Sequence, residues 1–127
     1  MTRTSAEVAQ VWEQFHRVVN MPSPELRDWL LATAPDGADA YAPEPGLDVR
    51  EVGERVLRLL EKRRVDVSPD DVTFMRTLAE ILCGMLADPP REDASYDPWR
   101  HSLMMMGHDP MRPDSPRGPE ATALIEN

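Results

Sequence analysis

Cysteine is nearly missing from this sequence: Cys83 is the only one, so no disulfide can form within the chain. Long hydrophobic runs are missing too, and no stretch approaches the roughly 18 apolar residues that a membrane-spanning helix needs. The opening segment, MTRTSAEVAQVWEQF, is charged throughout and does not resemble a secretion signal. Together these absences are typical of a reducing interior, so we predict a cytoplasmic protein that does not interact with membranes.

Positive charge is also scarce. Lys and Arg number 14 against 23 Asp and Glu, which gives a formal net charge of -9. This charge repels nucleic acid phosphates and anionic lipids at long range, so binding to either would require a local basic patch. The length of 127 residues is enough for one domain with one core.

Known catalytic motifs are missing as well. The sequence contains no GxSxG, no glycine-rich phosphate loop and no HExxH. Cys83 lies among apolar residues, where burial would raise the pKa of its thiol and leave it inert. We therefore predict that the protein is not an enzyme, has no catalytic residues and binds no cofactor.

The strongest helical pattern that is present runs from Ser68 to Asp88. Ser68 suits the N-cap, Pro69 suits the first helical position, and two prolines follow Asp88. The apolar residues between these ends form a wide stripe on one side of the helix, which predicts the central and most buried helix of the fold. They include Phe74, Leu78, Ile81, Leu82 and Met85.

Four other segments have the helical pattern. The first helix begins at Ser5 and the second at Ser23. Asp48 caps the third, and Asp97 caps a short last helix that Gly107 ends. We predict an all-α fold, a compact bundle of about five helices over residues 5–111, followed by a weakly ordered, proline-rich tail over residues 112–127. The predicted core consists of large apolar residues from all five helices: Trp12, Phe15, Leu26, Trp29, Val56, Leu60, Phe74, Leu78, Leu82 and Trp99.

Two local features predict how the helices pack. Gly53 lies inside the third helix, where glycine costs about 1 kcal/mol relative to alanine, so we expect a neighbouring helix to approach it closely. Trp12 and Trp29 are the candidate neighbours. The short connection Val65–Val67 predicts that the third helix and the central helix pack against each other.

The segment WRHSLMMMGHDP holds most of the residues with possible chemistry. Successive helical residues are about 100 degrees apart, so Met104, Met105 and Met106 cannot all face one side of a helix. We favour core positions for two of them and expect at least one to be exposed or to contact a partner, because methionine is common on adaptable binding surfaces.

His101, His108 and Asp109 form the only cluster of residue types that bind metals, and Cys83 or His16 could complete a site. The spacing of the two histidines matches no metal-binding motif. In the structural interpretation, His108 and Asp109 instead bond carbonyls or amides left free at a helix end. We favour this interpretation and predict no bound metal.

Arg58, Lys62, Arg63 and Arg64 form the one dense basic patch, and the short turn that follows invites comparison with helix-turn-helix DNA-binding proteins. The next helix, however, begins with two aspartates and has few hydrogen-bond donors for reading bases. A solvated helix end is therefore the favoured interpretation, and DNA binding is the alternative.

Three segments, VWEQFHRVVNM, VGERVLRLLEKRR and WRHSLMMMGHDP, resemble the actinobacterial family of proteins with the domain of unknown function DUF3140. The resemblance runs from roughly residue 10 to residue 113, with the closing WRHSLM and GHDP as its most specific piece. It implies no assigned reaction, and some members are labelled as DNA-binding proteins. Where relatives often have basic residues this chain has Cys83–Leu86, and Met105 and Met106 replace an aromatic or mixed pair. Both differences remove polarity and favour a protein partner.

These observations predict a small non-catalytic helical protein that binds or regulates through a protein partner or through self-association. The predicted partner surface combines the last helix and its GHDP extension with the apolar end of the central helix: Trp99, His101, Met104, Met105, Met106, His108, Asp109, Met85 and Leu86. DNA binding through the basic patch is the first alternative. Metal binding through His101, His108 and Asp109 is the second.

Overall fold

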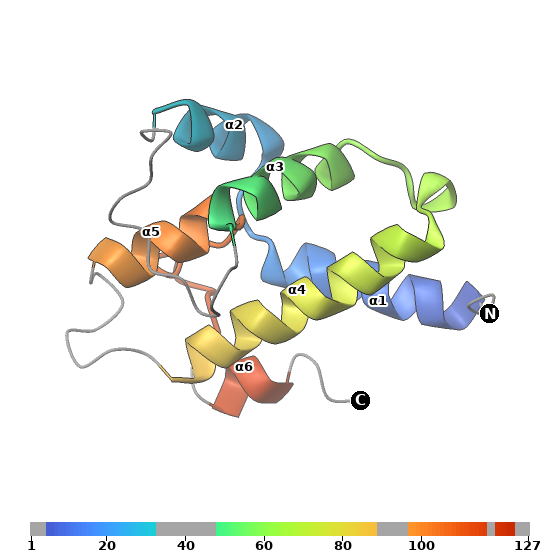
Figure 1. Ribbon diagram of the computed structural model, residues 1–127. Coiled ribbons are helices and arrows are strands. Elements are labelled where there is room, and N and C mark those ends of the chain that lie inside the picture. Colours follow the sequence, from blue (N-terminus) through green and yellow to red (C-terminus); the bar gives the residue numbers. More distant parts are fainter. Residues whose placement is uncertain (1–4, 33–47, 89–96, 117–118, 124–127) are drawn as a thin grey trace.

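The computed structural model describes residues 5–32, 48–88, 97–116 and 119–123. Within these ranges the secondary structure is helical and includes no strand, which confirms the all-α prediction. The described residues form six α-helices (Figure 1) and one 3-10 helix, η1, with these bounds: α1 Ser5–Val18, α2 Ser23–Ala32, α3 Val49–Leu60, η1 Arg64–Asp66, α4 Pro69–Ala87, α5 Asp97–Met105 and α6 Pro119–Ala123.

All five predicted helices are present, and local signals set their ends. At the start of α4 the Ser68 hydroxyl accepts the Asp71 N–H at 3.0 Å, while the Asp71 carboxylate accepts the Ser68 N–H at 3.0 Å. This reciprocal pair satisfies two amides that the first turn leaves free. Asp48 caps α3 as predicted, and Gly107, with a φ of 99°, ends α5 in a conformation that glycine adopts without strain.

The helices pack in two groups. The α4 group consists of α4 with α1 and α6, and the α3 group consists of α3 with α2 and α5. Figure 1 shows α3 and α4 diverging from η1, and the two are not a closely packed pair. The prediction that they pack against each other is met only by side chains, in the contacts of Arg55 with Asp71 and Phe74 at the start of α4. Their contacts are made by side chains near η1, because the turn sets the two helices at an angle.

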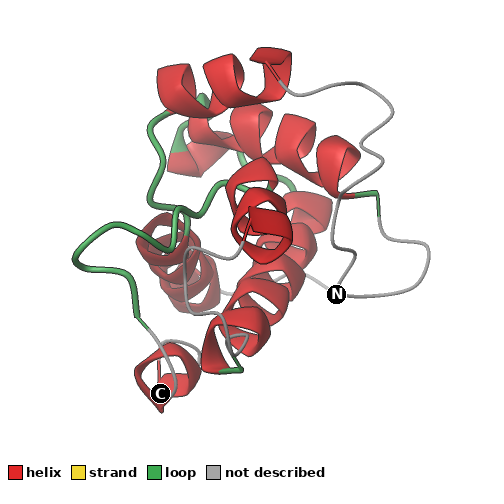
Figure 2. Cartoon of the chain, turned by 90° about the vertical axis from the view of Figure 1, so that its left-hand side faces the viewer, coloured by secondary structure: helices red, strands yellow, loops and turns green. Residues whose placement is uncertain are grey.

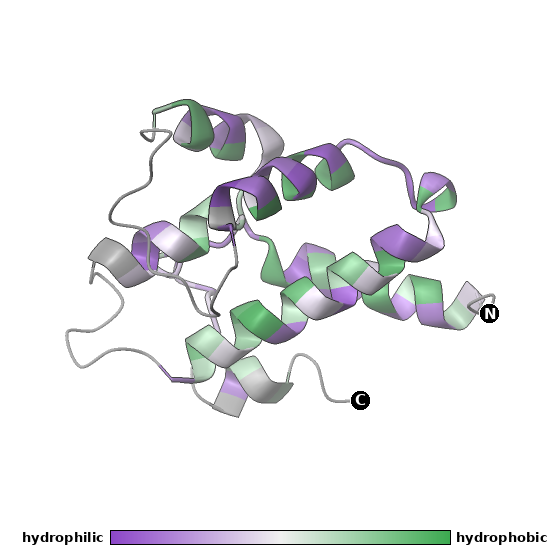
Figure 3. Ribbon diagram, in the orientation of Figure 1, coloured by the Kyte–Doolittle hydropathy of each residue, from purple (hydrophilic) through white to green (hydrophobic). Residues whose placement is uncertain are grey.

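The core lies between and within these groups. Figure 3 shows hydrophobic residues along much of α4 and hydrophilic residues over much of α3. Six predicted core residues are buried: Phe15, Leu26, Val56, Leu78, Leu82 and Trp99. The other four are partly buried and pack against the core: Trp12, Trp29, Leu60 and Phe74.

The three consecutive methionines are all buried. Met104, Met105 and Met106 are exposed by 8, 3 and 0%, so the prediction that at least one is exposed is wrong. The helical spacing behind that prediction does not apply to the whole run, because α5 ends at Met105. Helices α2 and α3 also pack on α5. The end of α5 is thus part of the interior.

Gly53 of α3 sits at a close helix contact, as predicted. A Cβ atom there would lie 2.0 Å from the carbonyl oxygen of Met105 and 3.1 Å from Cδ2 of Leu30. The nearest neighbours are therefore Met105 of α5 and Leu30 of α2, so the predicted helix of Trp29 is present at the contact, but the nearest atoms belong to neither predicted tryptophan. Only a residue without a side chain lets the backbones of α3 and α5 come this close.

Part of the C-terminal segment contacts the helices. Arg112 forms an ion pair with Glu25 of α2, and Ser115 lies 2.7 Å from the ring of His108. A helix that we did not predict, α6, packs on α4 and buries Ala121 completely. Contacts with the bundle therefore extend beyond residue 111 to α6. Among the described helices, none is long and apolar enough to cross a membrane.

Candidate functional site

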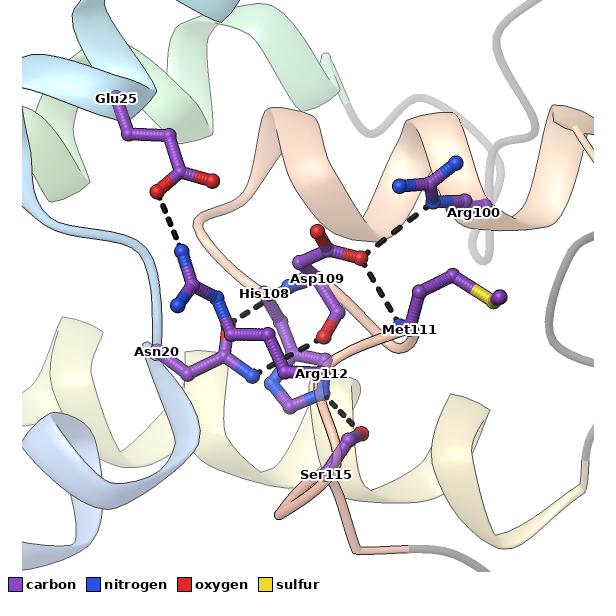
Figure 4. Close-up of polar contacts among 8 residues, drawn as sticks. All are labelled: Asn20, Glu25, Arg100, His108, Asp109, Met111, Arg112 and Ser115. Carbon is purple, nitrogen blue, oxygen red and sulfur yellow. Dashed lines mark hydrogen bonds and ion pairs between the residues drawn. The ribbon is translucent and has the colours of Figure 1, made fainter.

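The GHDP segment lies against the chain that connects α1 to α2 (Figure 4), and we call this contact the His108 junction. The His108 side chain is completely buried. Its Nδ1 lies 2.5 Å from the Val18 carbonyl oxygen at the end of α1, and its Nε2 lies 2.7 Å from Ser115 Oγ. A carbonyl oxygen can only accept, so Nδ1 carries a proton, and in the neutral ring Nε2 accepts the Ser115 hydroxyl.

Asp109 extends the His108 junction. Asn20, just beyond α1, pairs with the backbone of Asp109: its Oδ1 accepts the Asp109 N–H at 2.7 Å, and its Nδ2 donates to the Asp109 carbonyl at 3.1 Å. The Asp109 carboxylate accepts the Met111 N–H at 2.9 Å and lies 3.4 Å from Nε of Arg100. Two backbone segments far apart in sequence are thereby held in register.

Backbone bonds complete the contact. The Met21 N–H donates to the Gly107 carbonyl at 3.2 Å, and the His108 N–H donates to the Leu103 carbonyl at 2.9 Å. The prediction of bonds to groups left free at a helix end is confirmed for His108, whose ring bonds the Val18 carbonyl at the end of α1 and whose N–H bonds the Leu103 carbonyl in the last turns of α5, whereas Asp109 bonds Asn20 instead. Since α1 belongs to the α4 group and α2 to the α3 group, the His108 junction connects the two groups.

The structure separates the residues of the proposed metal site. His101 is exposed and its ring lies edge-on to Trp29, with 5.1 Å between ring centroids, whereas His108 points to Val18. His16 is on α1, and its Nδ1 bonds Trp12. Burial raises the pKa of the Cys83 thiol to about 11. Within the described ranges, no three His, Cys, Asp or Glu side chains gather to hold a metal ion.

The Ser115 and His108 pair has the short hydroxyl-to-imidazole distance of a catalytic dyad. Its surroundings indicate a structural role instead. The ring is fully buried, so a substrate cannot reach the nitrogen that would transfer the proton. The Ser115 N–H donates to the Arg112 carbonyl at 3.0 Å and is therefore part of a turn.

Most of the predicted partner surface lies inside the protein. Seven of its nine residues are buried: Trp99, Met104, Met105, Met106, His108, Met85 and Leu86. Asp109 is half-buried and His101 is exposed. Figures 1 and 2 show α6 beside the C-terminal end of α4, which is the part of that helix that contains Met85 and Leu86.

The basic patch is divided. Lys62 Nζ lies 2.5 Å from the Asp71 carboxylate, and Arg63 Nε lies 2.8 Å from the Asp66 carboxylate. Arg58 and Arg64 are exposed, and no described residue forms an ion pair with either. Two of the four cations are thus neutralised within the protein.

Sequence reasoning missed the role of Asp71, which is buried between α3 and α4. Besides Lys62, its carboxylate lies 3.6 Å from Nη2 of Arg55, whose guanidinium is 4.3 Å above the ring of Phe74. Burial would raise the pKa of Asp71, but the bonds from Lys62 and Ser68 and the charge of Lys62 outweigh it and lower that pKa. We call these residues the Asp71 cluster. The spacing of Ser68 and Asp71 was the available signal.

Within the described ranges, few large apolar side chains are exposed: Leu31, Val65 and Met111. Val65 is 80% exposed and is the middle residue of η1, between Arg64 and Asp66. We call Arg63–Asp66 the η1 tip. It combines an aliphatic side chain with one cation, Arg64, that no described residue pairs.

The comparison with known families agrees with the resemblance seen in the sequence. The model of DUF3140, described as a protein of unknown function, matches residues 14–104. The chain belongs to this family. The match ends before Gly107, so the GHDP segment that forms the His108 junction lies outside it. No curated protein and no solved structure matches the chain.

Proposed function

We propose that this DUF3140 protein is a small non-catalytic helical module that acts by binding a partner protein through the η1 tip. The observation that carries the proposal is the 80% exposure of Val65. Fully burying a valine side chain contributes about 1.5 kcal/mol or more, and arginine is enriched among the residues that dominate interfaces. Val65 beside Arg64 therefore fits an interface with an apolar pocket and nearby carboxylates.

The η1 tip is held in place before a partner arrives. Within it the Asp66 N–H donates to the Arg63 carbonyl at 2.9 Å, and the side chains of the same two residues pair. At its base the Asp71 cluster fixes the angle between α3 and α4. A rigid surface loses little conformational entropy on binding, which favours affinity.

DNA binding is the second candidate, because Arg58 and Arg64 pair with no described residue. Two cations neutralise few phosphates, however, and the exposed Asp66 and Asp70 lie close to them in the sequence. We expect duplex DNA to bind only in the non-specific range, with a Kd of about 10⁻⁴ to 10⁻⁶ M at physiological salt.

The first test compares Val65→Glu with Leu31→Glu in affinity captures from the native host. Leu31 is 75% exposed, so the two substitutions add the same charge at similarly exposed aliphatic residues. We expect Val65→Glu to lose the captured partner and Leu31→Glu to keep it, with equal melting temperatures. Retention of the same partners by both variants would remove the η1 tip as the binding surface.

The second test measures the anisotropy of labelled duplex DNA at physiological salt. Nanomolar binding by the parent that disappears in the Arg58→Ala and Arg64→Ala variants would replace the protein partner with DNA. Weak binding that these substitutions hardly change agrees with the proposed function.

A further inference from the structure

The short helix α6 covers part of α4. It has five residues, and of its described side chains Ala121 is fully buried while Glu120 and Ala123 are exposed. Isolated helices shorter than about 12 residues are marginal in water, so α6 depends on its contact with α4. The contact of α6 with α4 is smaller than the contact of α1 with α4, to which α1 brings the buried residues Val11, Phe15 and Val18.

The end of α4 that lies beside α6 (Figure 1) is rich in apolar residues. The second half of α4 contains the buried residues Leu82, Cys83, Met85 and Leu86, with Ile81 and Ala87 partly buried. Methionine is flexible and fits partners of different shapes. Because α6 lies beside this end of α4 in Figures 1 and 2, its departure would expose apolar surface there. The contact with α6 itself demonstrates that this surface accepts a helix.

Charge at the same end of α4 identifies the kind of helix that fits. The last turn contains no basic residue, and Glu80 and Asp88 are exposed. The C-terminus of a helix also carries a partial negative charge, which cations stabilise. A second copy of this chain would bring the same acidic end to the contact, so a basic partner is the better fit.

We propose that α6 is a displaceable cover over a docking site on the C-terminal half of α4, and that the site takes a partner helix with one apolar face bordered by Lys or Arg. The partner helix lies in the place of α6 and extends beyond it toward Asp88. The apparent affinity is then the affinity of the open site multiplied by the fraction of time for which the cover is open. This site is separate from the η1 tip.

Two variants of the full chain test the proposal. Ala121→Glu places a charge at the buried position of α6 and undocks it, whereas Ala123→Glu adds the same charge at an exposed position of the same helix. The probes are two synthetic amphipathic helices with the same leucine pattern, one with lysine and one with glutamate on the polar face. Affinity is measured by titration, and the binding site is located by backbone amide shifts.

The Ala121→Glu variant should bind the leucine-lysine helix about tenfold more tightly than Ala123→Glu does, a difference of about 1.4 kcal/mol. The shifts should fall on residues 79–88, and the leucine-glutamate helix should bind neither variant. Equal affinities for the two variants, or shifts confined to α2 and α3, would overturn the proposal.

Hydrogen exchange in the parent protein keeps the test decisive if Ala121→Glu does not fold. The amide of Ala123 should exchange much faster than that of Cys83, and saturating leucine-lysine helix should accelerate it further. If the α6 amides exchange only when the whole protein unfolds, α6 is a fixed part of the core and not a cover. Neither result depends on Val65, so a result that overturns the α6 proposal leaves the proposed function of the η1 tip untouched.

Discussion

The His108 junction and the Asp71 cluster both connect the α3 group to the α4 group, but they differ in where they lie and what they bond. The imidazole of His108 is fully buried and bonds a backbone carbonyl. The Asp71 carboxylate is 10% exposed, and the side chains of its partners Lys62 and Arg55 are 40 and 37% exposed. Because water screens the second set of contacts, we expect the His108 junction to contribute more to stability.

The largest effect should come from His108→Ala. The variant leaves the Val18 carbonyl without its partner and opens a cavity, so the free energy of unfolding should fall by about 3 kcal/mol. Urea denaturation measures the change. Ser115→Ala removes one hydrogen bond and should cost about 1 kcal/mol. A loss below about 1 kcal/mol for His108→Ala would mean that the His108 junction contributes no more to stability than the Asp71 cluster.

The second effect concerns the contact between α3 and α5 that accompanies the His108 junction. Gly53→Ala puts a Cβ atom 2.0 Å from the Met105 carbonyl oxygen, so we expect a loss of about 2 to 3 kcal/mol. Gly84→Ala is the matched control, because Gly84 of α4 is exposed and nothing lies within 4 Å of its Cβ position. It should raise stability by about 0.5 to 1 kcal/mol. Thermal unfolding of both variants shows whether the signs differ.

The third effect should be smaller. Asp71→Asn removes the charge that Lys62 and Arg55 contact, and we expect it to cost about 1 to 2 kcal/mol. Asp66→Asn breaks the exposed pair with Arg63 and should change stability by less than about 0.5 kcal/mol. Chemical denaturation at neutral pH compares them. Equal losses would mean that the burial of Asp71 adds nothing to its ion pairs.

The Asp71 cluster should also make stability depend on pH. The pKa of Asp71 is lower in the folded protein, so its contribution is present above the unfolded pKa, about 3.9, and is lost as pH falls through the folded pKa. The stability difference between the parent and Asp71→Asn should therefore shrink as the pH falls below about 4. A difference that stays constant between pH 7 and pH 3 contradicts this assignment.

The sequence predicted what depends on neighbouring residues. Ser68, Asp48 and Gly107 marked helix ends because capping acts within a few residues of the chain. The pairing of helices was harder to predict. Gly53 indicated a close contact but could not indicate that Met105 makes it, since any backbone fits against glycine.

The candidate site divides in the same way. The prediction that His108 bonds a helix end is confirmed, but the sequence did not indicate that its ring bonds the end of α1, about 90 residues earlier in the chain. The burial of Met106 was missed because helical spacing was applied beyond the end of α5. The exposure of Val65 had no signal in the sequence, because valine in a short link fits a core position equally well.

The central claim is that WRHSLMMMGHDP forms the interior connection between the two helix groups and is not the partner surface. Native-state hydrogen exchange of the Met21 and His108 amides tests it most directly, since they donate to Gly107 and Leu103 at the His108 junction. Both amides should exchange only through global unfolding, with a free energy equal to that from urea denaturation. Exchange as fast as that of the exposed η1 amides would contradict the claim and return this segment to the surface.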